Sequence, residues 1–221
     1  MSLDLLSIIK NIYYIILFVI SIFCVYNFKF FSKNYKYLAA LIVVSSAVEI
    51  FVELYNTFYL SHNTFYAYHF LLPFSMTLTY FTFKPYWNNS TQKVLGIVTF
   101  IFVILSFLNS FLNQEFANFP SNGLVLLCIL SDLFSLITLK QIIESKADVP
   151  LSKKPIFWVS ISILIYYTFS YLNFSFYIIY NSISLIYTLL YIAFRIILYS
   201  FYIALTYALY LNKKQTLENR N

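Results

Sequence analysis

Long hydrophobic stretches alternate with short polar segments along the whole chain. An α-helix rises about 1.5 Å per residue, so about 20 apolar residues are enough to cross a hydrocarbon core of about 30 Å. The polar segments between the stretches are too short to fold as separate domains. The pattern therefore predicts a single all-α transmembrane domain over residues 1–221, a polytopic membrane protein whose seven-helix bundle has spans at 5–28, 37–60, 64–83, 94–112, 123–143, 155–178 and 183–211.

The composition supports this prediction. Hydrophobic residues make up 61% of the chain and charged residues only 10%, whereas a soluble domain carries about 25% charged residues. Both cysteines, Cys24 and Cys128, fall inside predicted spans, where we expect them to be small buried side chains. The sequence contains none of the familiar nucleotide-binding, hydrolase or metalloprotease motifs. We therefore expect no catalytic residue, no metal and no cofactor.

Basic residues indicate how the chain crosses the membrane. Twelve of the 14 lysines and arginines lie at the ends of the first, third, fifth and seventh spans or after them, and the exceptions are Lys10 and Arg195. Because positive charge favours the cytoplasmic side, we expect the N-terminus outside and the C-terminus in the cytoplasm, with the protein integral to a bacterial inner (plasma) membrane. This orientation accounts for the net charge of +6 without nucleic acid. The basic inner loops would then contact lipid headgroups and a cytoplasmic protein partner.

Arg195 lies near the middle of the last predicted span. Helical periodicity places Tyr187, Tyr191 and Tyr199 on the same stripe of that helix. An arginine at membrane depth is costly and normally faces the interior of a bundle or a water-filled cavity. We therefore expect other helices to present anions to Arg195.

Four further ionisable side chains occur inside the predicted spans away from their ends. Glu49 and Glu53 are one turn apart on the second span, His69 is on the third and Asp132 on the fifth. Their depths predict that Arg195 pairs with Glu49 or Asp132, and that Glu53 faces His69. The predicted intramembrane cluster is Glu49, Glu53, His69, Asp132, Arg195, Tyr187, Tyr191 and Tyr199. Three interpretations stay open: a static network that fixes helix register, a ligand or ion cavity, and a switch between two packings.

The remaining polar positions predict the arrangement of the helices. We expect the first and fourth helices at the periphery or in a contact between subunits of a homo-oligomer. Trp87 and Trp158 lie near span ends, where aromatic residues typically anchor a protein at the membrane interface.

Two segments resemble those of known proteins. EIFVELYNTFYLSHNTFYAYHFLLPF (Glu49–Phe74) and PIFWVSISILIYYTFSYLNFSFY (Pro155–Tyr177) look like small seven-transmembrane proteins of AT-rich bacterial genomes. Some of these resemble the membrane-sensor modules of histidine kinases, and others the membrane accessory proteins of type VI-B CRISPR loci. The resemblance implies a role in signalling or as an accessory protein, and it assigns no catalytic residue.

The first functional expectation is a non-enzymatic sensor or regulatory accessory protein whose charged cluster is a switch or a ligand cavity. The alternative is a transporter coupled to protons or cations, or an oligomeric pore-forming effector such as a phage-defence accessory. A third is a membrane-embedded enzyme that uses Glu49, Glu53 and His69 as acid–base residues.

Overall fold

The computed structural model describes residues 3–58, 64–116, 118–145, 149–180 and 184–219, and the side chains of these except for 3–7 and 175–188. This part of the chain is helical and contains no strand. Its long helices are α1 (Leu3–Asn27), α2 (Lys33–Phe58), α3 (Phe65–Phe83), α4 (Asn89–Leu112), α5 (Ser121–Glu144), α6 (Pro155–Tyr180) and α7 (Ser184–Glu218). Short 3₁₀ turns follow at Phe28–Phe30, Lys84–Tyr86 and Leu151–Lys153. The prediction of an all-α fold is confirmed, and residues 59, 60 and 183 of the predicted spans lie outside the described residues.

Six of these helices are long and apolar enough to cross a membrane, which indicates a membrane-embedded protein. The exception is α3, whose 19 residues include several threonines and tyrosines and His69. This helix packs against α2, α4 and α5, and its polar side chains Ser75, Thr79 and Thr82 are buried. Because neighbouring helices cover α3, it does not need the fully apolar surface of a lipid-facing helix.

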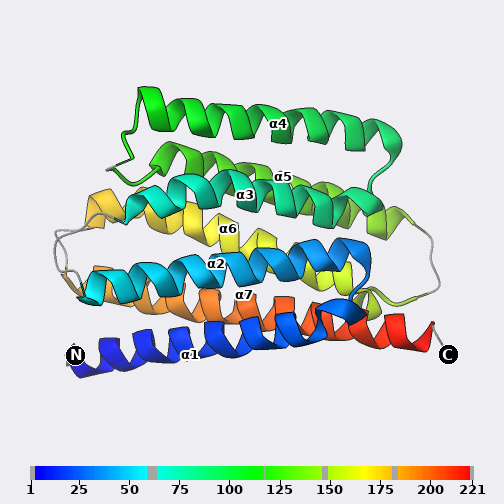
Figure 1. The fold of residues 1–221 in the computed structure, drawn as a ribbon, viewed down its shortest axis with the longest axis horizontal. Coiled ribbons are helices and arrows are strands. Elements are labelled where there is room, and N and C mark those ends of the chain that lie inside the picture. The colour runs from blue at the N-terminus through cyan, green and yellow to red at the C-terminus, as the bar shows by residue number, and fades with distance from the viewer. Residues whose placement is uncertain (1–2, 59–63, 117, 146–148, 181–183, 220–221) are drawn as a thin grey trace.

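The helices lie side by side and run antiparallel to their neighbours along the chain (Figure 1). Within the described residues, α1, α2, α3, α5, α6 and α7 contact one another in that order, and α7 returns to α1. The result is a ring of helices, with α4 packed outside it against α3 and α5. The peripheral position predicted for α4 is confirmed. Helix α1 closes the ring between α2 and α7, and its predicted contact with another subunit stays a prediction.

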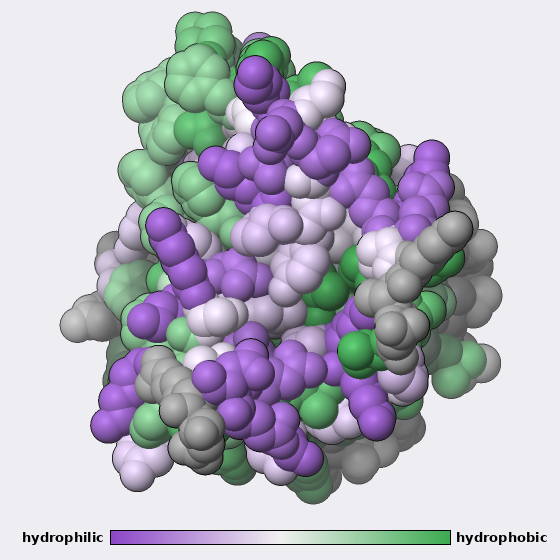
Figure 2. All heavy atoms as spheres, turned by 90° about the vertical axis from the view of Figure 1, so that its right-hand side faces the viewer, coloured by the Kyte–Doolittle hydropathy of each residue, from purple (hydrophilic) through white to green (hydrophobic). Residues whose placement is uncertain are grey.

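One end of the bundle collects the basic segments. The turns after α1, α3 and α5 lie at the end where the chain finishes (Figure 1), and hydrophilic side chains gather over it (Figure 2). We call this surface the basic end; it carries Lys29, Lys33, Lys36, Lys84, Lys93, Lys140, Lys153, Lys154, Lys213 and Lys214. The structure thus brings together the loops that the charge pattern assigns to the cytoplasm.

Helix α7 continues beyond the end predicted at residue 211, as far as Glu218. Its last turns are held by contacts with other elements: Asn212 Oδ1 accepts from the Ser32 backbone N–H at 3.0 Å, and Lys213 Nζ donates to Asn27 Oδ1 at 2.8 Å. Gln215 Nε2 donates to the Lys153 carbonyl at 2.9 Å. These contacts link the end of α7 to the α1–α2 turn and to the segment before α6.

Trp87 is buried, and the prediction that it anchors the protein at the membrane interface was wrong. Only 3% of the residue is exposed, and its Nε1 donates to Thr138 Oγ1 of α5 at 2.7 Å. Trp158 is partly exposed, and its Nε1 donates to the Ser152 carbonyl at 2.9 Å. Cys24 and Cys128 are free and buried, as predicted.

Candidate functional site

A cavity of about 300 Å³ lies between α1, α2, α6 and α7. Its lining combines one carboxylate, one guanidinium, one amide, several tyrosines and apolar side chains: Tyr13, Glu49, Tyr166, Asn173, Leu190, Tyr191, Phe194, Arg195, Leu198 and Tyr202. A second cavity of about 290 Å³ extends from it towards α3 and α5. Both cavities are lined by Glu49, Tyr166, Phe194 and Tyr202. Glu49 therefore lies where the two cavities adjoin.

Arg195 is held by aromatic rings. The guanidinium carbon lies 4.9 Å from the ring centroid of Tyr13 on α1 and 5.0 Å from that of Tyr191, one turn away on α7. The negative face of an aromatic ring attracts a cation at such distances. In the part of the chain that the structure describes, Arg195 Nε has no hydrogen-bond partner, and no ion pair joins Arg195 to a carboxylate. The predicted ion pair with Glu49 or Asp132 is absent from this structure.

Asp132 lies outside this cavity, at the contact between α5 and α6. Its Oδ2 accepts a hydrogen bond of 2.9 Å from Thr168 Oγ1, and Thr168 is an exposed residue of α6. Helix α5 packs against α3, α4 and α6. The prediction that Asp132 joins the cluster was wrong, because depth along a helix does not say which way a side chain points.

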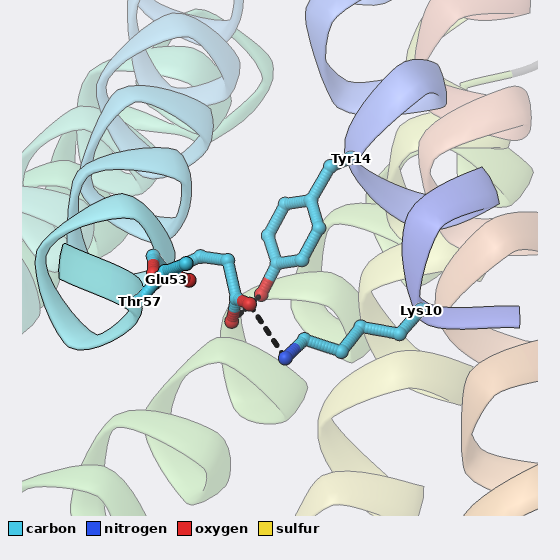
Figure 3. A network of polar contacts seen from close by, with 4 residues as sticks. All are labelled: Lys10, Tyr14, Glu53 and Thr57. Atoms are coloured by element: carbon cyan, nitrogen blue, oxygen red, sulfur yellow. Dashed lines mark hydrogen bonds and ion pairs between the residues drawn. The ribbon is translucent and has the colours of Figure 1, made fainter. Parts of the chain in front are cut away.

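Glu53 is bound by α1 and not by His69. Lys10 Nζ lies 2.5 Å from Glu53 Oε1, and Tyr14 donates to Glu53 Oε2 at 3.0 Å. Figure 3 shows both side chains reaching from α1 to Glu53, with Thr57 bonded to the Glu53 carbonyl one turn further along α2. The pair explains why Lys10 departs from the charge pattern: its ammonium is the counter-ion of a carboxylate on the neighbouring helix.

His69 faces α4 and the segment after it. Its Nδ1 lies 2.6 Å from Ser110 Oγ, and its Nε2 lies 2.8 Å from the Asn118 carbonyl. A carbonyl can only accept, so Nε2 carries a proton and donates it to the Asn118 carbonyl, while Nδ1 pairs with the Ser110 hydroxyl, which itself donates to the Ser106 carbonyl at 2.9 Å. The ring also packs against Phe116, with centroids 5.0 Å apart. The predicted contact of His69 with Glu53 was therefore wrong, and His69 is a structural link between α3, α4 and the two residues Phe116 and Asn118.

The tyrosines of the predicted stripe have different positions. Tyr191 lines the cavity, and Tyr199 donates to the Ile9 carbonyl at 2.5 Å, which joins α7 to α1. The side chain of Tyr187 lies outside the described residues. Of the predicted cluster, the structure brings together Glu49, Arg195 and Tyr191 around one cavity, with Glu53 and Tyr199 on adjoining contacts to α1.

Sequence reasoning missed the contribution of α1. Lys10, Tyr13 and Tyr14 are three and four residues apart, so they share one face of that helix. This spacing is visible in the sequence, but it indicates a contribution to the site only once α1 is known to pack between α2 and α7. Tyr166 and Tyr202 complete the lining from α6 and α7.

Comparison of the chain with protein-family models, with curated proteins and with solved structures found no significant match. Among the described residues, no three His, Cys, Asp or Glu side chains come close enough together to hold a metal ion. The charged groups on the cavity lining are one carboxylate, Glu49, and one guanidinium, Arg195.

Proposed function

We propose that the protein is a non-enzymatic sensor or regulatory accessory protein of the bacterial inner membrane, with seven spans, the N-terminus outside and the C-terminus in the cytoplasm. In this proposal the cavity binds a small ligand, and the basic end contacts a cytoplasmic protein partner. One observation carries it: Glu49 and Arg195 line the same cavity, yet no ion pair joins them.

The absence of pairing matters because charges inside a membrane protein are costly unless they are compensated. A static network would reduce this cost by direct contact between the two groups, as Lys10 and Glu53 do. Opposite charges that line one cavity without pairing with each other are instead open to contact with a ligand in that cavity. This geometry favours the ligand-cavity interpretation over the static network.

Helix α7 connects the cavity with the basic end. It carries Tyr191 and Arg195 at the cavity, and about 25 Å along its axis it carries Asn212 and Lys213, which bind the α1–α2 turn. A shift of α7 caused by occupancy of the cavity would change these contacts. The helix thus supplies a direct mechanical route between a ligand and a cytoplasmic surface.

The test uses distances between spin labels at the basic end. Lys93, near the start of α4, and Lys214, on α7, are exposed and can be replaced by labelled cysteines after Cys24 and Cys128 are changed to alanine. We expect Glu49→Gln or Arg195→Gln to change the distribution of distances between the labels at positions 93 and 214, measured in nanodiscs. The matched control is Asp132→Asn, which removes a carboxylate outside the cavity and should leave the distribution as it was.

Identical distributions in all these proteins would contradict the proposal. A parallel flux assay in liposomes tests the transport alternative. Passage of protons or small cations that Glu49→Gln abolishes would replace the sensor function with a transporter function.

A further inference from the structure

We propose that the ligand of the cavity is a small zwitterion, whose ammonium group binds Glu49 and whose anionic group binds Arg195. This inference rests on the proposed function and specifies the chemical class of its ligand. Its starting point is that Glu49 and Arg195 line the same cavity with opposite charges, and that neither has an ionic partner among the described residues.

Glu49 is the free carboxylate of α2. Glu53, one turn away, is already bound by Lys10 and Tyr14, so the Lys10 ammonium of α1 is paired with Glu53 and not with Glu49. Glu49 lines both cavities and accepts no hydrogen bond from a described side chain. A ligand ammonium would supply the donors that the protein does not provide there.

Arg195 is arranged to bind an anion with its edge. Tyr13 and Tyr191 lie against the guanidinium at 4.9 Å and 5.0 Å, and rings in such positions attract the cation. The N–H groups lie in the guanidinium plane, and they bind a carboxylate or a phosphate through two parallel hydrogen bonds. The unpartnered Nε belongs to this edge.

The size and walls of the cavity restrict the ligand. Ligand pockets in proteins usually measure about 300–1,000 Å³, so a cavity of about 300 Å³ suits a small molecule. Leu190, Phe194 and Leu198 provide apolar walls beside the charged groups. A ligand with a single charge would leave the opposite group of the protein uncompensated, whereas a zwitterion satisfies both. Free amino acids have this chemistry, and so does the ethanolamine phosphate headgroup of a lipid.

The first experiment measures binding to the full chain purified in detergent. The twenty common L-amino acids and phosphoethanolamine are screened by equilibrium dialysis, and the tightest amino acid is compared with its amide and its N-acetyl derivative. The amide lacks the carboxylate charge and the N-acetyl derivative lacks the ammonium charge. We expect each derivative to bind at least tenfold more weakly than the parent amino acid. Tighter binding of phosphoethanolamine than of every amino acid would assign the same chemistry to a lipid headgroup.

The second experiment assigns each charge to its residue. Arg195→Gln should bind the amide as well as it binds the free amino acid, and Glu49→Gln should bind the N-acetyl derivative as well as the free form. Asp132→Asn should keep the full preference of the unmodified protein. Should either cavity variant fail to fold, the ligand series on the unmodified protein decides the question alone.

Two results would overturn the inference: no binding by any of these zwitterions, or equal binding of the parent and both derivatives. Neither result affects the spin-label experiment. A distance change with cavity charge in the absence of zwitterion binding would leave the sensor function standing with a ligand of another class.

Discussion

The two carboxylates of α2 lie one helical turn apart and have different surroundings. Glu53 is bound by Lys10 and Tyr14 of α1, while Glu49 faces the cavity shared with Arg195. The sequence predicted that all three charges lie inside the bundle, because ionisable residues within apolar spans rarely face lipid. It did not predict their partners. Contacts between side chains depend on how each helix is rotated about its axis and on which helices are neighbours, and periodicity on one helix specifies neither.

Replacing Lys10 tests the pair with Glu53. Lys10→Gln leaves Glu53 with Tyr14 as its side-chain partner, and we expect a loss of about 1–2 kcal/mol in the free energy of unfolding, between the values for exposed and buried pairs. The intermediate value follows from the partial exposure of the two side chains, 41% for Lys10 and 27% for Glu53. Denaturant unfolding in detergent would measure it.

The matched control is Lys140→Gln. Lys140 pairs with Glu144 on the same helix at 3.9 Å, and both side chains are largely exposed, so the change should cost less than about 0.5 kcal/mol. The double variant with Lys10→Gln and Glu53→Gln should recover part of the loss, because no carboxylate is then left unpaired. Equal effects of the two lysine substitutions would mean that the Lys10 pair is only a surface contact.

Replacing His69 tests its role as a structural link. His69→Leu removes the donor to the Asn118 carbonyl and the partner of Ser110, and an unsatisfied buried group costs about 1–3 kcal/mol. We expect a loss of that size in unfolding experiments, with amino-acid binding unchanged because His69 does not line the charged cavity. Thr77→Val on the same helix removes a hydroxyl that donates to the Pro73 carbonyl of its own helix, and it should be nearly neutral. A loss of ligand binding in His69→Leu would contradict this assignment.

The helices themselves were predicted well, and their ends and neighbours less well. Long apolar runs predict α1 to α7 because the hydrocarbon core demands helices of about this length. Helix α7 continues beyond the predicted span because Asn212, Lys213 and Gln215 are stabilised by contacts with distant segments. The position of α1 was also missed. Lipid and protein interior are both apolar, so hydrophobicity alone does not distinguish a helix face that meets lipid from one that meets another helix.

The contact between α3 and α4 can be tested at Gly96. A Cβ atom at this position would lie 2.9 Å from the Tyr80 hydroxyl oxygen, and that hydroxyl donates to the Gln92 carbonyl at 3.1 Å. Gly96→Ala should therefore displace Tyr80 and lower the thermal midpoint, at a cost of about 1 kcal/mol for the lost hydrogen bond. Tyr80→Phe removes the obstructing atom, so adding Gly96→Ala to Tyr80→Phe should cost less than in the natural background. An equal cost in both backgrounds would show that the two helices are further apart than described.

For the whole molecule, the charge pattern and the fold give a consistent picture. The segments rich in lysine are spread along the sequence, and the antiparallel ring brings them to one end (Figure 1). A pattern of this kind is predictable because topology depends on short loops and on charge, which are local properties of the chain. The cavity was less predictable, because it requires side chains from α1, α2, α6 and α7 at once.

Fusion reporters test the orientation. A reporter fused after Asn221 should be active only in the cytoplasm, and one inserted within residues 113–120 only outside, because positively charged segments are retained on the cytoplasmic side. A reporter that is active outside after Asn221 and in the cytoplasm within residues 113–120 would mean that the orientation is the reverse of the predicted one. The same location at both sites would mean that α5 to α7 do not cross the membrane three times.

Trp87 and Trp158 are the two tryptophans of the chain, and both belong to the basic end: one is bonded to Thr138 in the core and the other to the Ser152 carbonyl near the surface. The cavity wall contains no tryptophan among its described residues. The ultraviolet emission of the unlabelled protein is therefore an optical signal from the basic end, with one shielded and one solvent-sensitive fluorophore. Neither indole lines the cavity, so a ligand there cannot quench it by direct contact. A change in the emission spectrum when the cavity is filled would therefore show that the basic end responds to a ligand bound elsewhere.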